Sequence, residues 1–150
     1  AGGSLALACD MRILSENAKL IEVFIRIGLI PDSGSHWFLA KMVGHARAFE
    51  YMTTGRDISA AEAERVGLAN LVVPSDRLEA ETMKLAQSLA QAPTAAIGFI
   101  KRTLNRCATA DLDDILDYEA IMQQAASETS DHEEGLKAFL EKRPARFTGS

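Results

Sequence analysis

The second half of the chain, residues 75–150, is a succession of amphipathic helical patterns with no strand pattern between them. Apolar residues recur at helical spacing and predict helices that begin at Asp76 and at Pro93, a third over Leu112–Ala126 and a last over Asp131–Lys142. Proline suits the first turn of a helix, where its missing N–H would have no partner. Such helices form a flat layer, so we expect this half to bury its apolar face on the first half or on another subunit.

Residues 1–74 differ, because glycines and prolines separate short segments. The predicted elements are a helix over Ser4–Cys9 after Gly2 and Gly3, a strand over Met11–Leu14 and a second strand over Leu20–Ile25. Gly28, Pro31 and Gly34 then mark a loop. The two patterns together predict an α/β fold over residues 1–74, followed by a helical region over residues 75–150.

Three further helical segments are expected after the loop. Ser33 or Ser35 is placed to cap a helix that runs through Val43, and His45–Thr54 continues as a helix that stops at Gly55. Another helix begins with the capping-box pattern of Ser59 and Glu62 and ends at Gly67, before a short strand over Leu71–Val73.

The composition is globular and excludes several classes of partner. Of the 150 residues, 47% are hydrophobic and 25% are charged, which is enough for one domain with a real core. The net charge of −5 disfavours nucleic acid and anionic membrane surfaces as partners. No apolar run approaches the ~20 residues of a membrane span.

Cys9 and Cys107 are too few for a disulfide framework and lack metal-ligand spacing, so we expect reduced thiols. That usage predicts a cytoplasmic (bacterial) or organellar-matrix protein. The three histidines are isolated from one another, and we expect no metal site and no cofactor. The start at Ala1-Gly2-Gly3, without Met or a basic segment, shows no signal peptide and looks like the middle of a longer sequence.

Asp32 is the first candidate for chemistry. Pro31 fixes the backbone before it, and the apolar strand together with Trp37 and Phe38 would partly desolvate its carboxylate. Desolvation moves a carboxyl pKa toward that of a working general base. The alternative is that Asp32 caps the following helix, a common fate of aspartate at such a position.

Two other segments carry weaker signals. Gly2-Gly3 before a helix leaves backbone N–H groups that can hold an oxyanion, or is a plain glycine turn. The segment from Phe139 to Arg143 combines an aromatic ring with cations that can grip a nucleotide base and phosphate. The simpler interpretation of that segment is a basic helix end that complements the helix dipole.

Several of these pieces, in this order, resemble one family. They are Gly2-Gly3-Ser4 through Asp10-Met11-Arg12-Ile13, Gly28-Leu29-Ile30-Pro31 with Gly34, Thr54-Gly55-Arg56 with Ser59-Ala60-Ala61-Glu62-Ala63, Val66-Gly67-Leu68 with Val72-Val73-Pro74, and Glu134-Gly135-Leu136-Lys137-Ala138-Phe139-Leu140-Glu141-Lys142-Arg143-Pro144. The sequence resembles the C-terminal part of the enoyl-CoA hydratase/isomerase (crotonase) superfamily over nearly all its length.

The resemblance implies a fold and a ligand. Residues 1–74 would be the C-terminal part of the ββα spiral core of the ClpP/crotonase type, and residues 75–150 a helical oligomerisation region that builds a homotrimer or hexamer. The partner would be an acyl-CoA thioester, with coenzyme A as part of the substrate. Two backbone N–H groups would stabilise its enolate, one of them at Ala1 or Gly2 and the other in an N-terminal half that this sequence lacks.

The resemblance also implies which side chains act. Hydratases of the family use two glutamates, and those positions are Ser4 and Phe24 here. Asp32 stands where the family's dienoyl-CoA isomerases, ring-epoxide isomerases and dehalogenases carry an aspartate. The segment Ile30–Gly34 with Trp37 is most similar to the ring-1,2-epoxyphenylacetyl-CoA isomerases.

An enoyl-CoA isomerase with Asp32 as its single acid/base is therefore expected. Phe24 and Trp37 would line the substrate pocket, and Phe139 and Lys142 would reach the CoA adenine end of a neighbouring subunit. Two alternatives remain, namely a hydratase with atypical catalytic residues and a truncated fragment without catalysis.

Overall fold

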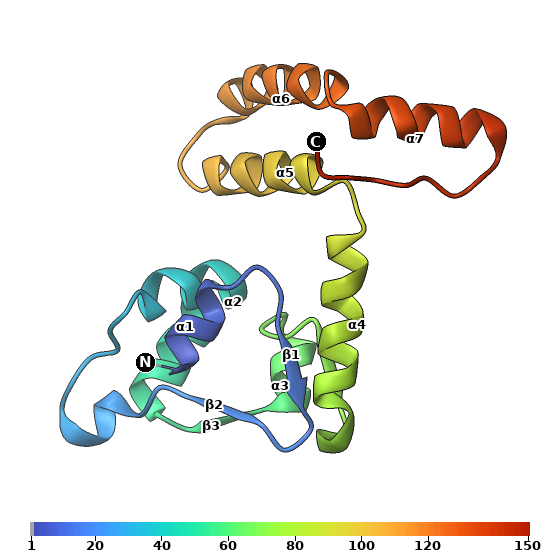
Figure 1. Ribbon diagram of the computed structural model, residues 1–150. Helices are drawn as coiled ribbons and strands as arrows, with labels where there is room; N and C mark the ends of the chain where they lie inside the picture. Colours follow the sequence, from blue (N-terminus) through green and yellow to red (C-terminus); the bar gives the residue numbers. More distant parts are fainter. Residues whose placement is uncertain (1) are drawn as a thin grey trace. The chain divides into compact units, whose positions relative to one another are not determined.

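The computed structural model describes residues 2–150, which divide into two compact units. The first ends at Thr82 and the second covers Met83–Ser150, so the boundary lies within helix α4 (Leu78–Ala90) (Figure 1). The change in sequence pattern at Pro74 comes earlier in the chain than this boundary.

The first unit is a mixture of short strands and helices. Its elements are α1 (Gly2–Ala8), β1 (Ile13–Ser15), β2 (Lys19–Ile21), the 3₁₀ helix η1 (Val23–Ile27), α2 (Ser35–Thr54), β3 (Asp57–Ser59), α3 (Ala60–Arg65), β4 (Leu71–Val73), the 3₁₀ helix η2 (Ser75–Arg77) and the first part of α4. Strand β1 pairs with β4 in parallel, with Ile13 opposite Leu71. Strand β2 pairs with β3 in antiparallel fashion, with Lys19 opposite Ser59. This order confirms the predicted α/β class and the strand over Leu71–Val73.

The predicted strand over Leu20–Ile25 is wrong beyond Ile21. The ladder with β3 ends where Ile21 faces Asp57, and the chain before β3 turns at Gly55 in the left-handed conformation. The ladder does not continue past this turn, and the chain coils into η1 instead. A β-branched, apolar segment follows the packing available to it rather than its intrinsic preference.

Helix α2 is interrupted at the position where the sequence predicts a break between two helical segments. Gly44 has φ 79° and ψ 165°, which separates the helix into the two predicted segments. Its cap is different from the prediction: Gly34, not Ser33 or Ser35, is the N-cap and makes no side-chain hydrogen bond. Glycine serves here because the backbone at this position is left-handed, with φ 84°.

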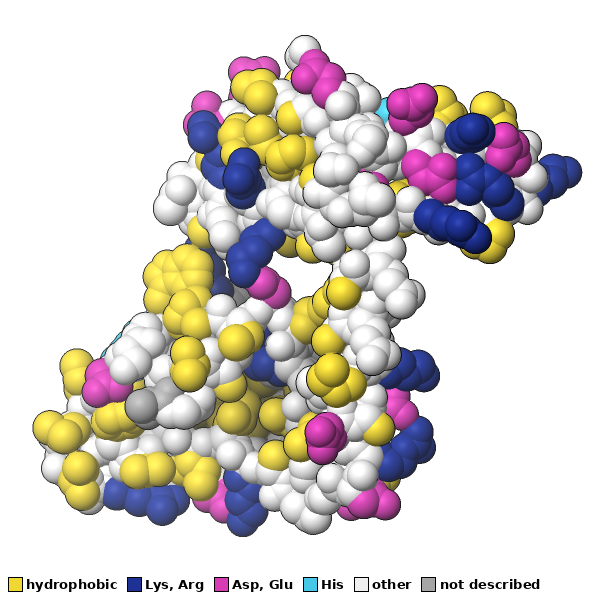
Figure 2. All heavy atoms as spheres, viewed as in Figure 1, with side chains coloured by type: hydrophobic (Ala, Val, Ile, Leu, Met, Phe, Trp, Pro, Cys, Tyr) yellow, Lys and Arg dark blue, Asp and Glu magenta, His cyan; other side chains and the backbone are white. Residues whose placement is uncertain are grey.

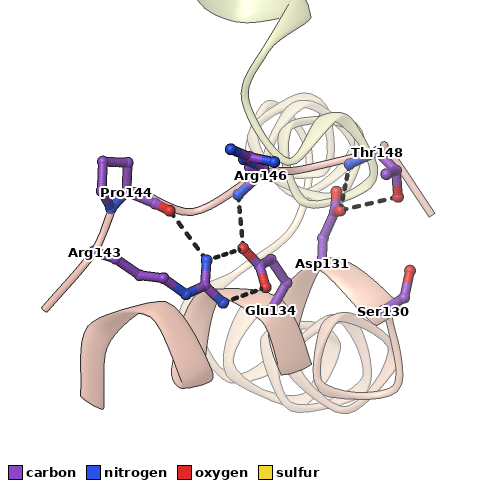
Figure 3. A pocket seen from close by; sticks show the side chains of 7 residues that line it. All are labelled: Ser130, Asp131, Glu134, Arg143, Pro144, Arg146 and Thr148. Atoms are coloured by element: carbon purple, nitrogen blue, oxygen red, sulfur yellow. Dashed lines mark hydrogen bonds and ion pairs between the residues drawn. The ribbon is translucent and has the colours of Figure 1, made fainter. Parts of the chain in front are cut away.

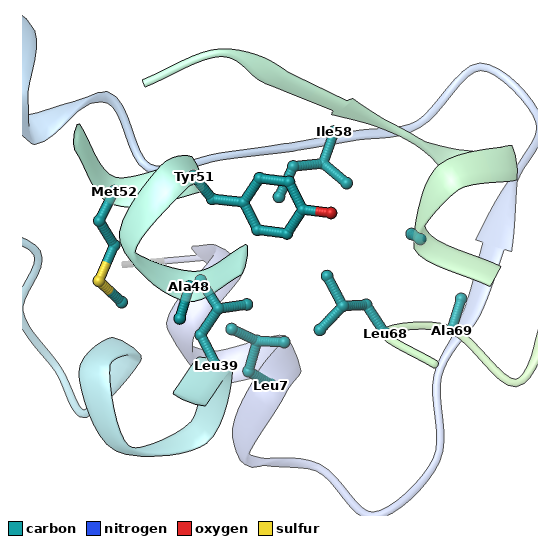
Figure 4. Packing of buried hydrophobic residues seen from close by; sticks show 9 residues of the cluster. Leu7, Leu39, Ala48, Tyr51, Met52, Ile58, Leu68 and Ala69 are labelled. Carbon is teal, nitrogen blue, oxygen red and sulfur yellow. The ribbon is translucent and has the colours of Figure 1, made fainter. Parts of the chain in front are cut away.

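The core of the first unit lies between α1, α2, β3 and α3 (Figure 4). Its buried members are Leu7, Leu39, Ala48, Tyr51, Met52, Ile58, Ala63, Leu68 and Ala69. Tyr51 is buried, and its hydroxyl donates to Oε1 of Glu62 at 3.0 Å. The core thus fixes α2 against the elements that precede and follow it.

Glu62 combines a helix cap with an ion pair. Its backbone N–H donates to Ser59 Oγ at 3.2 Å, which confirms the N-cap half of the capping box. Its carboxylate receives two hydrogen bonds from Arg56, at 2.7 and 2.8 Å. These bonds to Arg56 lower the pKa of Glu62 from 4.5 to about 2.

We expect Glu62→Gln to reduce the acid sensitivity of the fold. A carboxyl whose pKa is lowered on folding stabilises the protein above its unfolded pKa, and that stabilisation is lost as pH falls from about 4.5 toward 2. The wild type should therefore take up about one more proton on unfolding in this window than the variant does. Denaturant unfolding at several pH values gives the free energy of unfolding of both proteins. The difference in proton uptake is the difference between their slopes against pH. Equal slopes would show that Glu62 keeps its pKa on folding.

The second unit, beyond its part of α4, consists of α5 (Thr94–Arg106), α6 (Leu112–Ser127) and α7 (Ser130–Glu141). These bounds confirm the helices predicted in this half, although α4 follows the turn η2 and Pro93 is the N-cap of α5 rather than its first residue. Large hydrophobic side chains remain exposed on all three helices, among them Leu104, Leu112 and Leu140. Figure 2 shows hydrophobic side chains on the visible surface of both units.

The last residues of the chain fold back onto α7 (Figure 3). Asp131 is buried and accepts the backbone N–H groups of Thr148 at 2.7 Å and Gly149 at 2.9 Å. Glu134 accepts two bonds from Arg143, at 2.7 and 2.8 Å, and one from the backbone of Arg146. The bonds from Arg143 lower the pKa of Glu134 to about 2. Two acidic side chains of one helix thus hold the C-terminal segment.

Candidate active site

Asp32 lies on the exposed loop between η1 and α2, and the structure gives it a defined conformation. Pro31 before it is buried, while Asp32 itself is exposed, so the predicted partial desolvation is wrong for the described residues. Too little of the surrounding apolar sequence packs over the loop to cover the carboxylate. Oδ1 of Asp32 accepts the hydroxyl of Ser33 at 2.9 Å.

The capping alternative for Asp32 is not observed, because the cap of α2 is Gly34 without a side-chain bond. Instead, the backbone of the next residue is strained. Ser33 has φ 54°, in the left-handed region that L-residues other than Gly, Asn and Asp rarely adopt. Strain of this kind persists only where the surroundings impose it, and it is concentrated at functional sites.

A buried chain of polar side chains lies beneath this loop. Ser4 on α1 lies 2.8 Å from Ser35 on α2, measured between the two Oγ atoms. Ser35 Oγ donates to Oε1 of Glu22 at 3.0 Å, and Ser4 Oγ lies 3.3 Å from the backbone oxygen of Asp32. The three side chains are 6% exposed or less. Burial raises the pKa of Glu22, and the bond from Ser35 opposes that shift.

Glu22 is the functional candidate that sequence reasoning missed. It is an acidic residue inside the apolar segment Leu20–Ile25. A lone carboxylate within an apolar run was the available signal. Its connection to Ser4 and Ser35 depends on the packing of α1 against α2, which the sequence pattern does not give.

Phe24 and Trp37 lie on either side of the loop in sequence. Phe24 is half-buried within η1, and Trp37 is 52% exposed on α2. The Trp37 ring packs edge-on against Phe38, with centroids 5.1 Å apart, and Lys41 Nζ lies 5.7 Å from its centroid. Their role in a substrate pocket stays a prediction.

An apolar hollow of about 410 Å³ opens beside the loop. It is lined by Ile25, Leu29, Ile30, Pro31, His36, Ala40, His45, Ala48, Phe49, Met52 and Thr53. Pro31 connects this hollow to Asp32 along the chain, although Asp32 itself does not line it. Beside the candidate acid, the first unit therefore offers a surface suited to an apolar group.

Phe139 and Lys142 lie at the C-terminal end of α7. Phe139 is 79% exposed, and Lys142 is the C-cap with a left-handed backbone, φ 54°. The helix therefore ends with a free aromatic face next to a cation. Contact of these residues with CoA stays a prediction, as does the part of the basic end in balancing the helix dipole.

Ala1 lies outside the described residues, and Gly2 is the exposed first residue of α1. Cys9 and Cys107 are both exposed and free. Within residues 2–150, no three His, Cys, Asp or Glu side chains gather as metal ligands, and no helix there has the length and apolar character to cross a membrane.

Comparison with known proteins places these features in context. A family model described as "Enoyl-CoA hydratase/isomerase" matches residues 1–150. The chain is 40% identical over 149 residues to a 1,2-epoxyphenylacetyl-CoA isomerase of Escherichia coli K12, which covers 99% of this chain and 57% of that protein.

Solved structures agree with the sequence comparison. An enoyl-CoA hydratase from Bacillus anthracis superposes with a TM-score of 0.94 at 36% identity, over 99% of this chain and 58% of that one. An enoyl-CoA hydratase/isomerase from Cupriavidus metallidurans CH34 gives 0.93 at 35% identity, over 99% and 56%. The chain thus has the crotonase fold in part and spans a little over half the length of these relatives. It belongs to the enoyl-CoA hydratase/isomerase family.

Proposed function

We propose that the protein carrying this chain isomerises an acyl-CoA thioester by shuttling a proton on Asp32. The observation that carries the proposal is the pairing of one carboxylate on a strained, defined loop with non-acidic residues at the two hydratase positions, Ser4 and Phe24. The neighbouring hollow offers room for an apolar acyl group. Phenylalanine has no group that can accept a proton, and the hydroxyl of serine is too weak a base to activate water at neutral pH on its own.

The chemistry needs only one acid that changes protonation state twice. Asp32 would remove a proton alpha or gamma to the thioester carbonyl and return it to another carbon, which shifts the double bond or rearranges a ring. The enolate formed between these steps would be stabilised by backbone N–H groups, including that of Ala1 or Gly2. An acyl group seated in the neighbouring apolar hollow would exclude water from that side of the intermediate.

A hydratase is the second candidate, because Glu22 supplies another carboxylate hydrogen-bonded, through Ser35, to the group that includes Ser4. Assays with a 3-enoyl-CoA and with crotonyl-CoA, run on the protein with its natural flanking sequence, separate the two. We expect double-bond migration in the first substrate and negligible water addition to the second. Water addition without migration would establish the hydratase instead.

We propose that Phe139 and Lys142 bind the nucleotide end of CoA, and we expect Lys142→Gly to separate stability from binding. Glycine adopts φ 54° without the steric cost paid by lysine, so the fold should gain about 1 kcal/mol. The dissociation constant for CoA should rise about tenfold through loss of one charge-assisted hydrogen bond. Thermal unfolding and calorimetric titration measure the two effects. Lys142→Arg is the control, because it keeps the charge and the backbone cost.

The exposed apolar side chains of α5, α6 and α7 support a further part of the proposal, a homotrimer or hexamer. Ile100, Leu116 and Phe139 are each more than half exposed in the single chain. Several large apolar side chains exposed together are typical of subunit interfaces.

A further inference from the structure

The number of protons in the hydrogen-bonded chain from Glu22 to the Asp32 loop depends on whether Glu22 is ionised. Ser4 and Ser35 each carry one hydroxyl proton, and three contacts connect them to Glu22, to each other and to the Asp32 carbonyl. With Glu22 ionised, two protons serve three oxygen–oxygen contacts. With Glu22 protonated, three protons serve them.

The distances decide which contact loses its proton. An ionised Glu22 only accepts, so Ser35 donates to it at 3.0 Å. The two serine oxygens are 2.8 Å apart, which requires a proton between them, and Ser4 must supply it. The Asp32 carbonyl, at 3.3 Å from Ser4, is then left without the Ser4 bond and, among the described residues, keeps the backbone N–H of Ser35, at 3.1 Å.

Protonation of Glu22 reverses the chain. Glu22 then donates to Ser35, Ser35 donates to Ser4, and Ser4 donates to the Asp32 carbonyl. That carbonyl has two lone pairs and accepts both Ser4 and the Ser35 backbone. All three contacts are now hydrogen bonds, and the loop is tied to α1.

The surroundings of Glu22 favour such a change. Burial raises its pKa, and the titratable side chains whose charges act on it are His36, which lowers the pKa, and Asp32, which raises it. Helix α1 presents no charged residue. Arg26, on η1, donates to the carbonyl oxygen of Gly55 instead.

We propose that Glu22 is a positioning residue for the Asp32 loop, and that its protonation makes the hydrogen bond from Ser4 to the Asp32 carbonyl. Any consequence for turnover rests on the proposed function of Asp32. The hydrogen-bond switch itself does not, and it is tested without turnover.

The test is an NMR titration of the peptide bond between position 32 and Ser33. The background variant Asp32→Asn/His36→Asn removes the two other titratable side chains near Glu22. Labelling with [1-¹³C]asparagine and [¹⁵N]serine then marks this peptide bond, because the chain has no other Asn–Ser pair. Labelled glutamate in the same protein, with its natural flanking sequence, reports the midpoint of Glu22 by the signal that Glu22→Gln removes.

We expect the carbonyl resonance at position 32 to move downfield as pH falls, with the same midpoint as Glu22. Glu22→Gln should abolish the movement. Ser4→Ala should also abolish it while Glu22 still titrates, and Ser35→Ala provides a second interruption of the chain. A resonance that stays fixed while Glu22 titrates would overturn the switch. Equal movement in the Ser4→Ala protein would overturn it too, because the charge of Glu22 would then act directly through space.

Failure of the switch and failure of the proposed function give different results. If isomerisation survives Asp32→Asn while the resonance still follows Glu22, the catalytic assignment is wrong and the switch stands. If isomerisation is lost but the resonance is fixed, the assignment stands and Glu22 is only a buried carboxylate.

Discussion

Replacing Asp32 by asparagine is expected to lower kcat for isomerisation of a 3-enoyl-CoA by about 10²–10⁴-fold, the usual contribution of a general acid/base. Asparagine has nearly the same volume and still accepts the hydrogen bond from Ser33, so the loop should keep its conformation. It cannot take up a proton from carbon. KM should therefore change little, and steady-state kinetics with both enzymes measure the split.

The matched control is Asp76→Asn, which neutralises an exposed aspartate in η2 of the same unit. It should leave kcat unchanged. If Asp32→Asn retains full turnover, another residue removes the proton, and Asp32 is a loop residue. Water addition to crotonyl-CoA that persists in the variant would show that another group donates the proton, either Glu22 or a residue in the flanking sequence.

Leu39→Ala is expected to cost about 2–5 kcal/mol of unfolding free energy, the range found for removing a buried leucine side chain. Leu39 is 1% exposed and packs in the cluster with Leu7 and Tyr51. Truncation there leaves a cavity between α1 and α2, the two helices that carry Ser4 and Ser35. Against a total stability of about 5–15 kcal/mol, this loss is large. Denaturant titration of the full protein measures it.

Leu39→Met is the control for this experiment, because it keeps the side-chain volume and should cost less than about 1.5 kcal/mol. Similar losses in the two variants would mean that the shape of leucine, rather than the filled volume, matters at this position. A loss below about 1 kcal/mol in Leu39→Ala would show that the helices collapse onto the vacated space.

Local chemistry made most helices predictable. Gly44 divides α2 and Ser59 caps α3, as the sequence indicates, and α5 begins directly after Pro93, where the sequence predicts a helix to begin. These signals are local because a cap or a glycine acts on its own turn. The segment Leu20–Ile25 was not predictable in this way, since its conformation depends on where the distant strand β3 begins.

The candidate site, too, was predictable from the sequence only in its local features. Asp32 follows a proline in a glycine-containing loop, and the pattern alone identified it as a candidate. The exposure of Asp32 and the backbone strain at Ser33 could be seen only in the structure. The sequence shows Glu22 only as a lone carboxylate in an apolar segment, because its partners, Ser4 and Ser35, are 18 and 13 positions away and meet only through packing.

The parallel pairing of β1 with β4 has a consequence for synthesis of the protein. Ile13 cannot pair until Leu71 has been synthesised. The ladder has only three residue pairs to offset the entropy lost on closing that long loop. At about 5–20 residues per second, the ribosome needs roughly 2–8 s to pass from position 32 to position 71. During that interval the Asp32 loop emerges before β4 exists to close the segment around it. Slowing translation after Thr54 would prolong exposure of the apolar helix α2, and nascent chains stalled there should be favoured targets of a holdase chaperone.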